Sequence, residues 1–387
     1  MSETMKIGLD ANGIVGNATE LGSFGRTLAT ALAATADMEL LLYAADAGQE
    51  DLRKQVAESD TLHYHYPQGS QLLGKARWQT KGIVKQMADD GIQLYHGLMG
   101  QLPEGLAKAG IRSVVNIHDV DFISHPEFYT ATEVKTLTKV FQQTVAEADS
   151  IVAPSECTRS AICSLADIDP ARVEVIPPCC DPRFSTEPNM RMVWYVREKY
   201  ELPDRYVLSV GTIDERHNIM QAVKALQTLP DDLSLLVVGS VTYYTDSVWD
   251  YVDHHGLHDR VVMLHHTPGE HLPAMYRMAE AFVYPARHDA FALPVAEAVS
   301  MGLPVVACTG AGTEEAGGPH SLYVRPDDDS AMANAIAEVL TGAQGRQKRI
   351  ESGLTYASRF KSSETARHYA ALYRRLLEES GKSPTDE

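Results

Sequence analysis

Short apolar runs of strand length alternate along the first half of the chain with longer segments whose apolar residues have helical spacing. The helix-like segments include GRTLATALAAT and KTLTKVFQQTVAEA. The apolar runs between such segments are LLLYA (40–44), QLYHGL (93–98), SVVNIHD (113–119) and SIVAPS (150–155). Strands that alternate with helices indicate βαβ units, so this half of the chain is predicted to form a parallel sheet.

The same alternation begins again after residue 205, which predicts a second sheet. Its apolar runs are YVLSVG (206–211), LSLLVVG (233–239), RVVMLH (260–265), AFVYPA (281–286), LPVVAC (303–308) and SLYV (321–324). The segment CCDPRFSTEPN has the composition of a linker, and YVREKYELP after it is expected to form a short helix. A chain of 387 residues is too long for one hydrophobic core. The sequence therefore favours two doubly wound α/β domains, with a ligand at the carboxyl ends of their strands.

Composition and charge exclude several classes of protein. With 44% apolar and 22% charged residues, the chain is globular and not disordered. The net charge of −18 argues against nucleic-acid binding and against purely electrostatic docking on anionic lipid. No apolar run is long enough to span a bilayer, the N-terminus has no signal-peptide core, and the five cysteines show no metal-ligand pattern. We therefore expect a cytoplasmic protein with reduced thiols.

The most informative stretch for function is PARHDAFALPVAEAVSMGLP, residues 285–304. Two carboxylates, Asp289 and Glu297, flank an apolar turn that ends at Pro294. Proline fits the first turn of a helix, and the unpaired N–H groups of that turn attract an anion. This layout suits a ligand with hydroxyl groups at both ends and a diphosphate in the middle. An ordinary loop-to-helix junction with two solvated acids is the alternative interpretation.

This stretch resembles the donor signature of the retaining family-4 glycosyltransferases, also called glycosyl transferases group 1, which have the GT-B fold. Their usual form is Glu, seven residues, Glu, with Gly-Phe-Gly-Leu-Pro between. Here the second Glu is Glu297 and the first is Asp289. The residues between them that match the family's donor-binding turn are Ala290, Phe291, Ala292 and Leu293, with alanine in place of both glycines. The resemblance implies that the first carboxylate holds sugar hydroxyls and that the second holds the ribose.

Further segments resemble the family in the same order along almost the whole chain. They are MKIGLDANGIVG, GSFGRTLATAL, VVNIHDVDFISHPEFY, ADSIVAPSECTRSAI, VEVIPPCCDPRF, YVLSVGTIDERHNIMQAVKAL, EEAGGPHSLYVRPDD and FKSSETARHYAALYRRLL. The resemblance implies two Rossmann-like domains that face each other across a cleft. The expected acceptor-side domain is residues 1–182, the expected nucleotide-sugar-binding domain is residues 183–361, and a helix at about residues 362–380 is expected to cross back to the first domain.

The expected cations of the donor site are where this sequence departs most from its relatives. Gly211 ends a strand and is followed by Thr212, as in the Thr-bearing subgroup of the family. Arg216 is a permanent cation whose planar fork suits phosphate oxygens. The position where many relatives have Lys holds His217, which is a cation only while its imidazole is protonated. A solvated turn is the alternative for both side chains.

Three more segments carry residues that the resemblance assigns to the site. His118 follows the strand SVVNI and is expected to contact donor-sugar or phosphate oxygens, with a capping or buried histidine as the alternative. The segment Gly22-Ser23-Phe24 is expected to be a loop before the first helix, with its N–H groups near phosphate or acceptor. His266 lies in a loop that the family places near the nucleotide base.

Three other clusters favour structural or surface roles. The acidic run Asp327–Asp329 precedes a predicted helix, so helix capping is preferred to a metal site, and the resemblance implies a metal-free mechanism. Histidines also gather near residues 254–266 without a repeating ligand spacing, so surface and loop positions are expected for them. The segment LLGKARWQTKGIVKQ is interpreted as a solvated amphipathic helix, and contact with a membrane or a lipid-linked acceptor is the alternative. Any membrane contact is expected to be peripheral at most.

Two functions remain open at this stage. The first is a retaining enzyme that moves a sugar from a nucleotide-diphosphate sugar to a hydroxyl of a glycan, lipid-linked or protein acceptor, without a cofactor. The second is a catalytically weak relative that binds nucleotide or glycan as a scaffold or partner subunit. His118, Arg216 and Asp289 are the expected catalytic residues. None of the motifs offers a convincing nucleophile. The resemblance therefore implies a front-face attack, in which the departing phosphate oxygen takes the proton of the acceptor.

Overall fold

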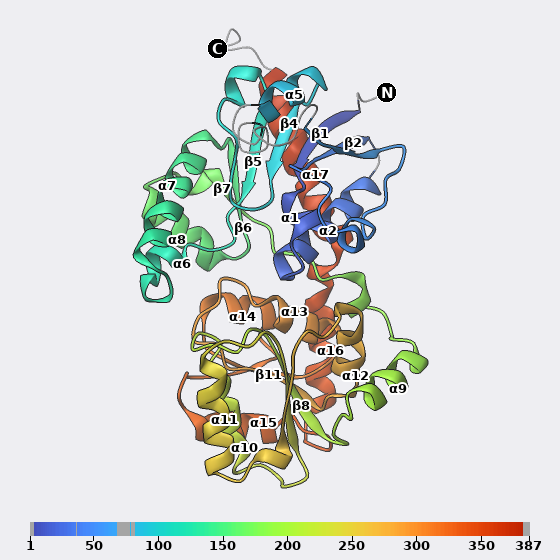
Figure 1. Ribbon diagram of the computed structural model, residues 1–387, viewed down its shortest axis with the longest axis vertical. Coiled ribbons are helices and arrows are strands. Elements are labelled where there is room, and N and C mark those ends of the chain that lie inside the picture. Colours follow the sequence, from blue (N-terminus) through green and yellow to red (C-terminus); the bar gives the residue numbers. More distant parts are fainter. Residues whose placement is uncertain (1–3, 36, 68–77, 79–81, 382–387) are drawn as a thin grey trace. The chain divides into compact units, whose positions relative to one another are not determined.

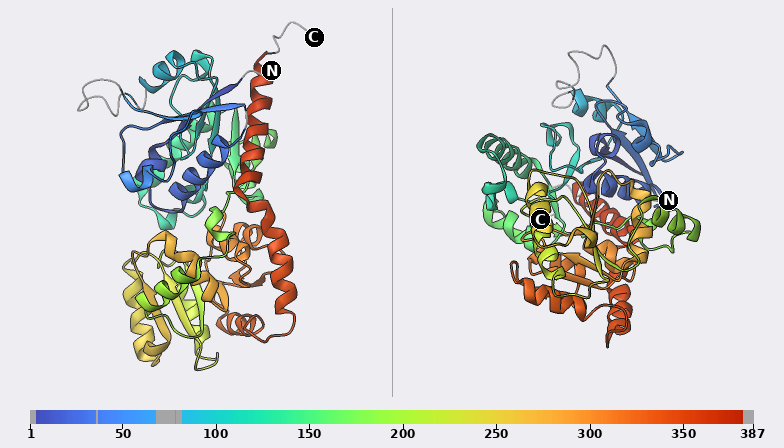
Figure 2. Two further views of the ribbon diagram at one scale, coloured as in Figure 1. Left: turned by 90° about the vertical axis from the view of Figure 1, so that its right-hand side faces the viewer. Right: turned by 60° about the horizontal axis from the view of Figure 1, so that its bottom comes forward.

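Two parallel sheets form in the chain, and helices cover both faces of each sheet (Figure 1, Figure 2). The computed structural model describes residues 4–35, 37–67, 78 and 82–381. Contacts divide the chain into unit 1, which is Met1–Cys179 with Ser362–Glu387, and unit 2, which is Cys180–Lys361. Among the described residues, no helix is long and apolar enough to cross a membrane.

The sheet of unit 1 has seven strands in the order β3-β2-β1-β4-β5-β6-β7, and every neighbouring pair is parallel. The strands are β1 (Met5–Asp10), β2 (Met38–Tyr43), β3 (Leu62–His65), β4 (Leu94–Gly97), β5 (Arg112–Asn116), β6 (Ser150–Ala153) and β7 (Val173–Val175). The α-helices of this unit are α1 (Asn12–Gly16), α2 (Glu20–Ala33), α3 (Glu50–Arg53), α5 (Ile83–Asp89), α6 (Asp121–Ser124), α7 (Ala131–Glu147), α8 (Glu156–Ala166) and α17 (Ser362–Gly381).

The sheet of unit 2 has six parallel strands in the order β10-β9-β8-β11-β12-β13. The strands are β8 (Tyr206–Val210), β9 (Ser234–Val238), β10 (Val261–Leu264), β11 (Ala281–Tyr284), β12 (Val305–Cys308) and β13 (Leu322–Val324). The α-helices are α9 (Met190–Lys199), α10 (Ile219–Leu226), α11 (Tyr244–His254), α12 (Leu272–Met278), α13 (Leu293–Ser300), α14 (Ala311–Gly317), α15 (Asp329–Ala337) and α16 (Arg346–Ala357).

The ten apolar runs of the sequence each contain a strand, so the predicted parallel α/β architecture is confirmed. These strands read as nearly continuous apolar runs because both faces of each sheet are buried under helices. In β8, for example, Tyr206 and Leu208 belong to one core and Val207 to the other. The pattern did not predict the edge strands β3 and β7, whose sequences LHYH and VEV interrupt the apolar run with polar residues.

Helix α17 packs on unit 1, although it is the last helix of the described chain (Figure 1). Its buried residues, among them Tyr369 and Tyr373, share a core with β1 and with helix α2. The expected helix at about residues 362–380 therefore forms and returns to the first sheet. Two buried cores, one on each face, enclose that sheet.

Two local predictions need correction, and a third lies mostly outside the described residues. Gly22, Ser23 and Phe24 lie inside helix α2 and not in a loop, and the Ser23 N–H already donates to Thr19 O at 3.0 Å. The expected helix over YVREKYELP begins earlier, at Met190, and its α-helical part ends at Lys199. In the basic segment LLGKARWQTKGIVKQ, Lys75, Arg77 and Lys81 lie outside the described residues. Trp78 is 8% exposed and belongs to a hydrophobic core, so its ring is not available to a membrane.

Candidate active site

The loops after β8 and β11 lie side by side at the carboxyl edge of the sheet in unit 2. These two strands are neighbours, and the chain leaves β8 toward β9 and β10 before it returns at β11. Such a reversal leaves a crevice at the strand ends, which is where doubly wound sheets bind ligands. The N–H of Arg287 donates to Arg216 O at 2.8 Å and ties the two loops together. The donor residues expected from the sequence therefore stand on adjacent loops of one sheet edge.

The loop after β8 brings Arg216 and His217 to this edge. Its first residue, Gly211, has a φ of 152°, a conformation that residues with side chains rarely adopt. A Cβ on Gly211 would also stand 3.2 Å from the His217 ring. Gly211 thus lets the histidine fold back against the strand end. Thr212, half-buried beside it, accepts a hydrogen bond from the Asp214 N–H at its carbonyl oxygen, at 3.1 Å.

Both ring nitrogens of His217 contact charged side chains. Nδ1 lies 2.7 Å from Asp214 Oδ1, which also accepts the His217 N–H at 2.8 Å. Nε2 lies 3.5 Å from an Arg216 nitrogen. Because guanidinium only donates and carboxylate only accepts, this arrangement fits a neutral ring that is protonated at Nδ1. Burial raises the pKa of Asp214, but its hydrogen bonds with His217 outweigh that effect and the net pKa is lowered.

The loop after β11 orients Asp289 through both of its carboxylate oxygens. Oδ2 accepts the hydroxyl proton of Tyr284 at 2.6 Å, and Oδ1 accepts the N–H of Phe291 at 3.2 Å. The Tyr284 ring also meets His217 edge to face, with ring centres 6.2 Å apart. One tyrosine thus connects the expected sugar-binding carboxylate with the expected phosphate-binding histidine.

Helix α13 begins at this loop as the sequence predicted, with Pro294 in its first turn. Asp289 satisfies the N–H of Phe291, whereas those of Ala292 and Leu293 have no hydrogen-bond partner among the described residues. Such N–H groups at a helix start are donors for an anion. Glu297 follows one turn later, half-buried, and its Oε2 accepts the Tyr276 hydroxyl proton at 3.2 Å.

The motif comparison missed three side chains of this site and one glycine. Asp214, Tyr276 and Tyr284 orient His217, Glu297 and Asp289 respectively. A Cβ on Gly312, in α14, would stand 2.2 Å from Ala290 O and 2.4 Å from Asp289 O, so only glycine allows this helix to pack on the donor loop. The sequence TGAG (309–312), which spans the start of α14, was the available sequence signal for this glycine. The contact of Tyr276 with Glu297 had none, because it joins helices α12 and α13, which are separated by strand β11.

The remaining polar clusters of unit 2 have structural partners. Asp327 pairs with Arg287, and Asp328 caps α15 by accepting the Ala331 N–H at 3.0 Å, so the predicted helix cap is confirmed. His254, His255 and His258 are exposed at or just beyond the end of α11, as expected. His266 is exposed in the loop after β10 with a φ of 56°. His265 Nδ1 holds that loop to Gly239 O, at 3.0 Å.

Unit 1 holds the other predicted residues, at the carboxyl edge of its own sheet. His118 follows β5, its Nε2 donates to Leu98 O at 2.7 Å, and its ring meets Phe24 edge to face at 5.9 Å. Burial lowers the pKa of His118 despite this hydrogen bond. The ring is therefore neutral at physiological pH, and Nδ1, which has no partner among the described residues, can accept a hydroxyl proton.

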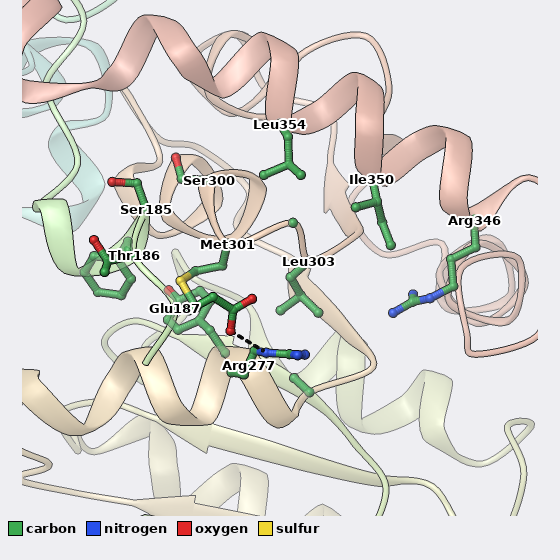
Figure 3. A pocket seen from close by; sticks show the side chains of 14 residues that line it. Ser185, Thr186, Glu187, Arg277, Ser300, Met301, Leu303, Arg346, Ile350 and Leu354 are labelled. Carbon is green, nitrogen blue, oxygen red and sulfur yellow. Dashed lines mark hydrogen bonds and ion pairs between the residues drawn. The ribbon is translucent and has the colours of Figure 1, made fainter. Parts of the chain in front are cut away.

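A cavity of about 400 Å³ lies elsewhere in unit 2 (Figure 3). Its lining includes Gly302 and Leu303, which precede β12, so it lies at the amino end of the sheet and not at the donor loops. Figure 3 shows Arg277 paired with Glu187 at its wall, with an N–O distance of 3.2 Å. Tyr276 lines the cavity too, and its hydroxyl connects this region with Glu297.

Comparisons with known proteins agree with this arrangement. The family model described as Glycosyltransferase Family 4 matches residues 23–184, and that described as Glycosyl transferases group 1 matches residues 195–355. The chain belongs to the group 1 glycosyltransferases. Structures of the GT-B class share its fold: the crystal structure of Anabaena HepE in complex with UDP has a TM-score of 0.73 at 16% identity, over 96% of this chain and 100% of the other.

Two relatives illustrate the sequence similarity of this glycosyltransferase. The O-antigen chain mannosyltransferase B of Escherichia coli is 28% identical over 272 residues, which are 69% of this chain and 70% of the relative. The D-inositol 3-phosphate glycosyltransferase of Stackebrandtia nassauensis is 26% identical over 329 residues, which are 79% of this chain and 74% of the relative. The names of the two relatives state different reactions, so the family does not by itself identify the substrates here.

Proposed function

We propose that this glycosyltransferase moves a sugar from a nucleotide-diphosphate sugar to a hydroxyl of a glycan, lipid-linked or protein acceptor, with retention and without a metal. The observation that carries the proposal is the donor edge of unit 2. Arg216, His217, Asp289 and the N–H groups that open α13 stand on adjacent loops at the carboxyl edge of one sheet, and Glu297 follows one turn into α13. This set matches a ligand with a diphosphate between two groups of hydroxyls.

In this proposal each group acts on one part of the donor. Arg216 and the N–H groups of Ala292 and Leu293 neutralise the diphosphate as it leaves. Asp289, oriented by Tyr284, accepts hydrogen bonds from sugar hydroxyls, and Glu297, oriented by Tyr276, accepts them from the ribose. The bond between the anomeric carbon and the phosphate oxygen breaks, and the acceptor oxygen forms its bond on the same face. The acceptor proton goes to the departing phosphate oxygen.

The metal-free part of the proposal is supported by the partners of the acidic residues. In the run Asp327–Asp329, the first residue pairs with Arg287, the second caps α15, and the third lies 3.8 Å from Lys224. A side chain committed to an ion pair or a cap is a poor ligand for a metal. Addition of EDTA is therefore expected to leave kcat/KM unchanged, and a loss that Mg²⁺ or Mn²⁺ restores would contradict this part.

The test of the donor site is calorimetry with UDP and GDP on Glu297→Gln. Replacing a charged hydrogen-bond acceptor with a neutral one is expected to cost about 1–3 kcal/mol of binding. Glu338→Gln, an exposed change beyond α15, serves as the matched control and should bind as the wild type does. Equal affinity of both variants and the wild type would remove Glu297 from the site.

Assays of donor hydrolysis with the same purified protein distinguish an enzyme from a scaffold. UDP-glucose is a first donor because a HepE structure contains it, and a mannosyl nucleotide is a second because a relative is named a mannosyltransferase. The alternative function rests on Asp289, His217, Ala290 and Ala292, which replace the usual residues of the motif. Slow hydrolysis of at least one donor is expected of an enzyme. Binding without hydrolysis of any donor would favour a catalytically weak scaffold.

A further inference from the structure

A second cavity, of about 330 Å³, lies in unit 1 and is not used by the donor residues described above. Its lining combines the ends of β1 and β4 with the start of α5 and one side of α7. The lining residues that carry the argument are Asp10, Asn12, Tyr95, Gln101, Glu104 and Gln143. Its volume is within the range of small-molecule sites, about 300–1,000 Å³.

The position of this cavity follows from the sheet order of unit 1. Strands β1 and β4 are neighbours, while the chain leaves β1 toward β2 and β3 before it returns at β4. The cavity is thus at the point of unit 1 where a doubly wound sheet leaves a crevice for a ligand. Tyr95 pairs in register with Gly8, and Asp10 lies two residues further along β1, so both side chains are on one face of the sheet.

Two of the lining side chains are buried and still have hydrogen-bonding capacity. Asp10 is 8% exposed, and its Oδ1 accepts from the Asn12 N–H at 3.0 Å and from the Asn12 side chain at 2.8 Å. Among the described residues, Asp10 Oδ2 and the hydroxyl of Tyr95, which is 3% exposed, have no hydrogen-bond partner. Neither atom is fully enclosed, and both residues line the cavity, so a ligand hydroxyl can reach them.

The chemistry of the lining selects the class of ligand. Side-chain amides of Asn12, Gln101 and Gln143 stand with the carboxylates of Asp10 and Glu104, and Gln143 donates to Glu104 at 3.0 Å. These groups pair with hydroxyls, while Leu102 and Val140 offer apolar contact to the carbon face of a ring. The described lining contains two carboxylates and no Lys or Arg, so it repels a phosphate or a carboxylate.

We propose that this cavity binds an uncharged pyranoside of the acceptor, with its hydroxyls held by Asp10 and Tyr95. The inference rests on the proposed function, because it identifies what the transferred sugar is joined to. It goes further by selecting neutral glycan ends over phosphorylated or acidic ones.

The experiment measures binding of methyl α-mannopyranoside, methyl α-glucopyranoside and methyl N-acetyl-β-glucosaminide to the full chain by saturation-transfer NMR at millimolar concentration. The matching 6-phosphates are the charged probes. At least one neutral glycoside is expected to bind, and its 6-phosphate at least about tenfold more weakly. Failure of every neutral probe to bind, or equal binding of the phosphates, would overturn the proposal.

Two conservative variants connect the binding to these side chains. Tyr95→Phe removes one hydroxyl and is expected to weaken glycoside binding by about two- to tenfold, and Asp10→Asn by about tenfold. Tyr43→Phe is the matched control. Tyr43 also packs against Gly8, but its hydroxyl bonds to Asp90 and it does not line the cavity. Glycoside binding that is equal in all three variants contradicts the proposal.

Binding of UDP and GDP to the same variants separates this inference from the proposed function. Nucleotide binding is expected to be unchanged in these unit 1 variants, because Arg216 and Glu297, which are proposed to hold the diphosphate and the ribose, belong to unit 2. If nucleotides bind and the glycosides do not, the acceptor inference fails while the donor site stands. If glycoside binding depends on Asp10 and no nucleotide binds, the cavity is a glycan site and the transfer reaction is refuted.

Discussion

His96 is enclosed completely in unit 1, where it connects the first sheet with helix α17. Its Nδ1 lies 2.6 Å from the hydroxyl of Tyr373, and its Nε2 lies 3.0 Å from Asn116 Oδ1, which also accepts the Tyr369 hydroxyl proton at 2.8 Å. The ring is therefore neutral, with its proton on Nε2 and a tyrosine donating to Nδ1. Burial, the main cause, lowers its pKa from 6.5 to about 4.

This pKa predicts how stability depends on pH. Between pH 6.5 and about 4 the unfolded chain binds a proton at His96 that the folded chain does not bind. The free energy of unfolding is therefore complete above pH 6.5 and falls as the pH falls toward 4. At roughly 1.4 kcal/mol for each pH unit, the total loss is about 3 kcal/mol, most of which has already occurred at pH 4.5.

The assay compares the wild type with His96→Gln, which cannot titrate. The chain has three tryptophans, so Trp194→Phe with Trp249→Phe leaves Trp78, a core residue of unit 1, as the fluorescent reporter of urea unfolding. His96→Gln is expected to be less stable than the wild type at pH 8. The difference should shrink by about 2–3 kcal/mol at pH 4.5.

The control and the refuting result use the same quantity, the difference in free energy of unfolding between a variant and the wild type. The matched control is His368→Gln, which changes an exposed histidine of helix α17. Carboxylates that titrate in the same range are common to all variants and cancel. A difference between His96→Gln and the wild type that stays constant from pH 8 to pH 4.5 would mean that the ring is not buried as a neutral group.

Three further predictions concern the donor loops. Gly312→Ala places a Cβ against two backbone carbonyls and is expected to lower the free energy of unfolding by about 1–3 kcal/mol, measured by calorimetry. Gly310→Ala is the control and should be tolerated, because its Cβ would meet only Thr313 Oγ1, at 3.7 Å. Equal stability of the two variants contradicts the packing argument. Asp289→Glu is expected to change the ranking of donor sugars in hydrolysis assays more than the affinity for nucleotide, and uniform losses across all donors would show that the residue does not read the sugar. Arg216→Ala should reduce kcat/KM more than His217→Ala, because the guanidinium is always charged; the opposite order would make His217 the main phosphate group.

The sequence by itself determined the architecture and the place of the donor motif. Parallel strands buried on both faces must be apolar along their length, so their positions can be read directly from the chain. The start of α13 could likewise be predicted, because Pro294 favours the first turn of a helix through its own backbone conformation. The role of Asp328 as a helix cap is local for the same reason.

Contacts between distant segments were decided only by the tertiary structure. Tyr276 reaches Glu297 across 21 positions, Gly312 packs on the carbonyls of residues 289 and 290, and Tyr373 reaches His96 across 277 positions. Each of these depends on which strands become neighbours, and a local pattern of polar and apolar residues does not contain the strand order. The glycine segment at residue 22 shows the same limit, since a Cβ there would stand 1.9 Å from Asn17 O. Close packing in helix α2 therefore requires a glycine at this position.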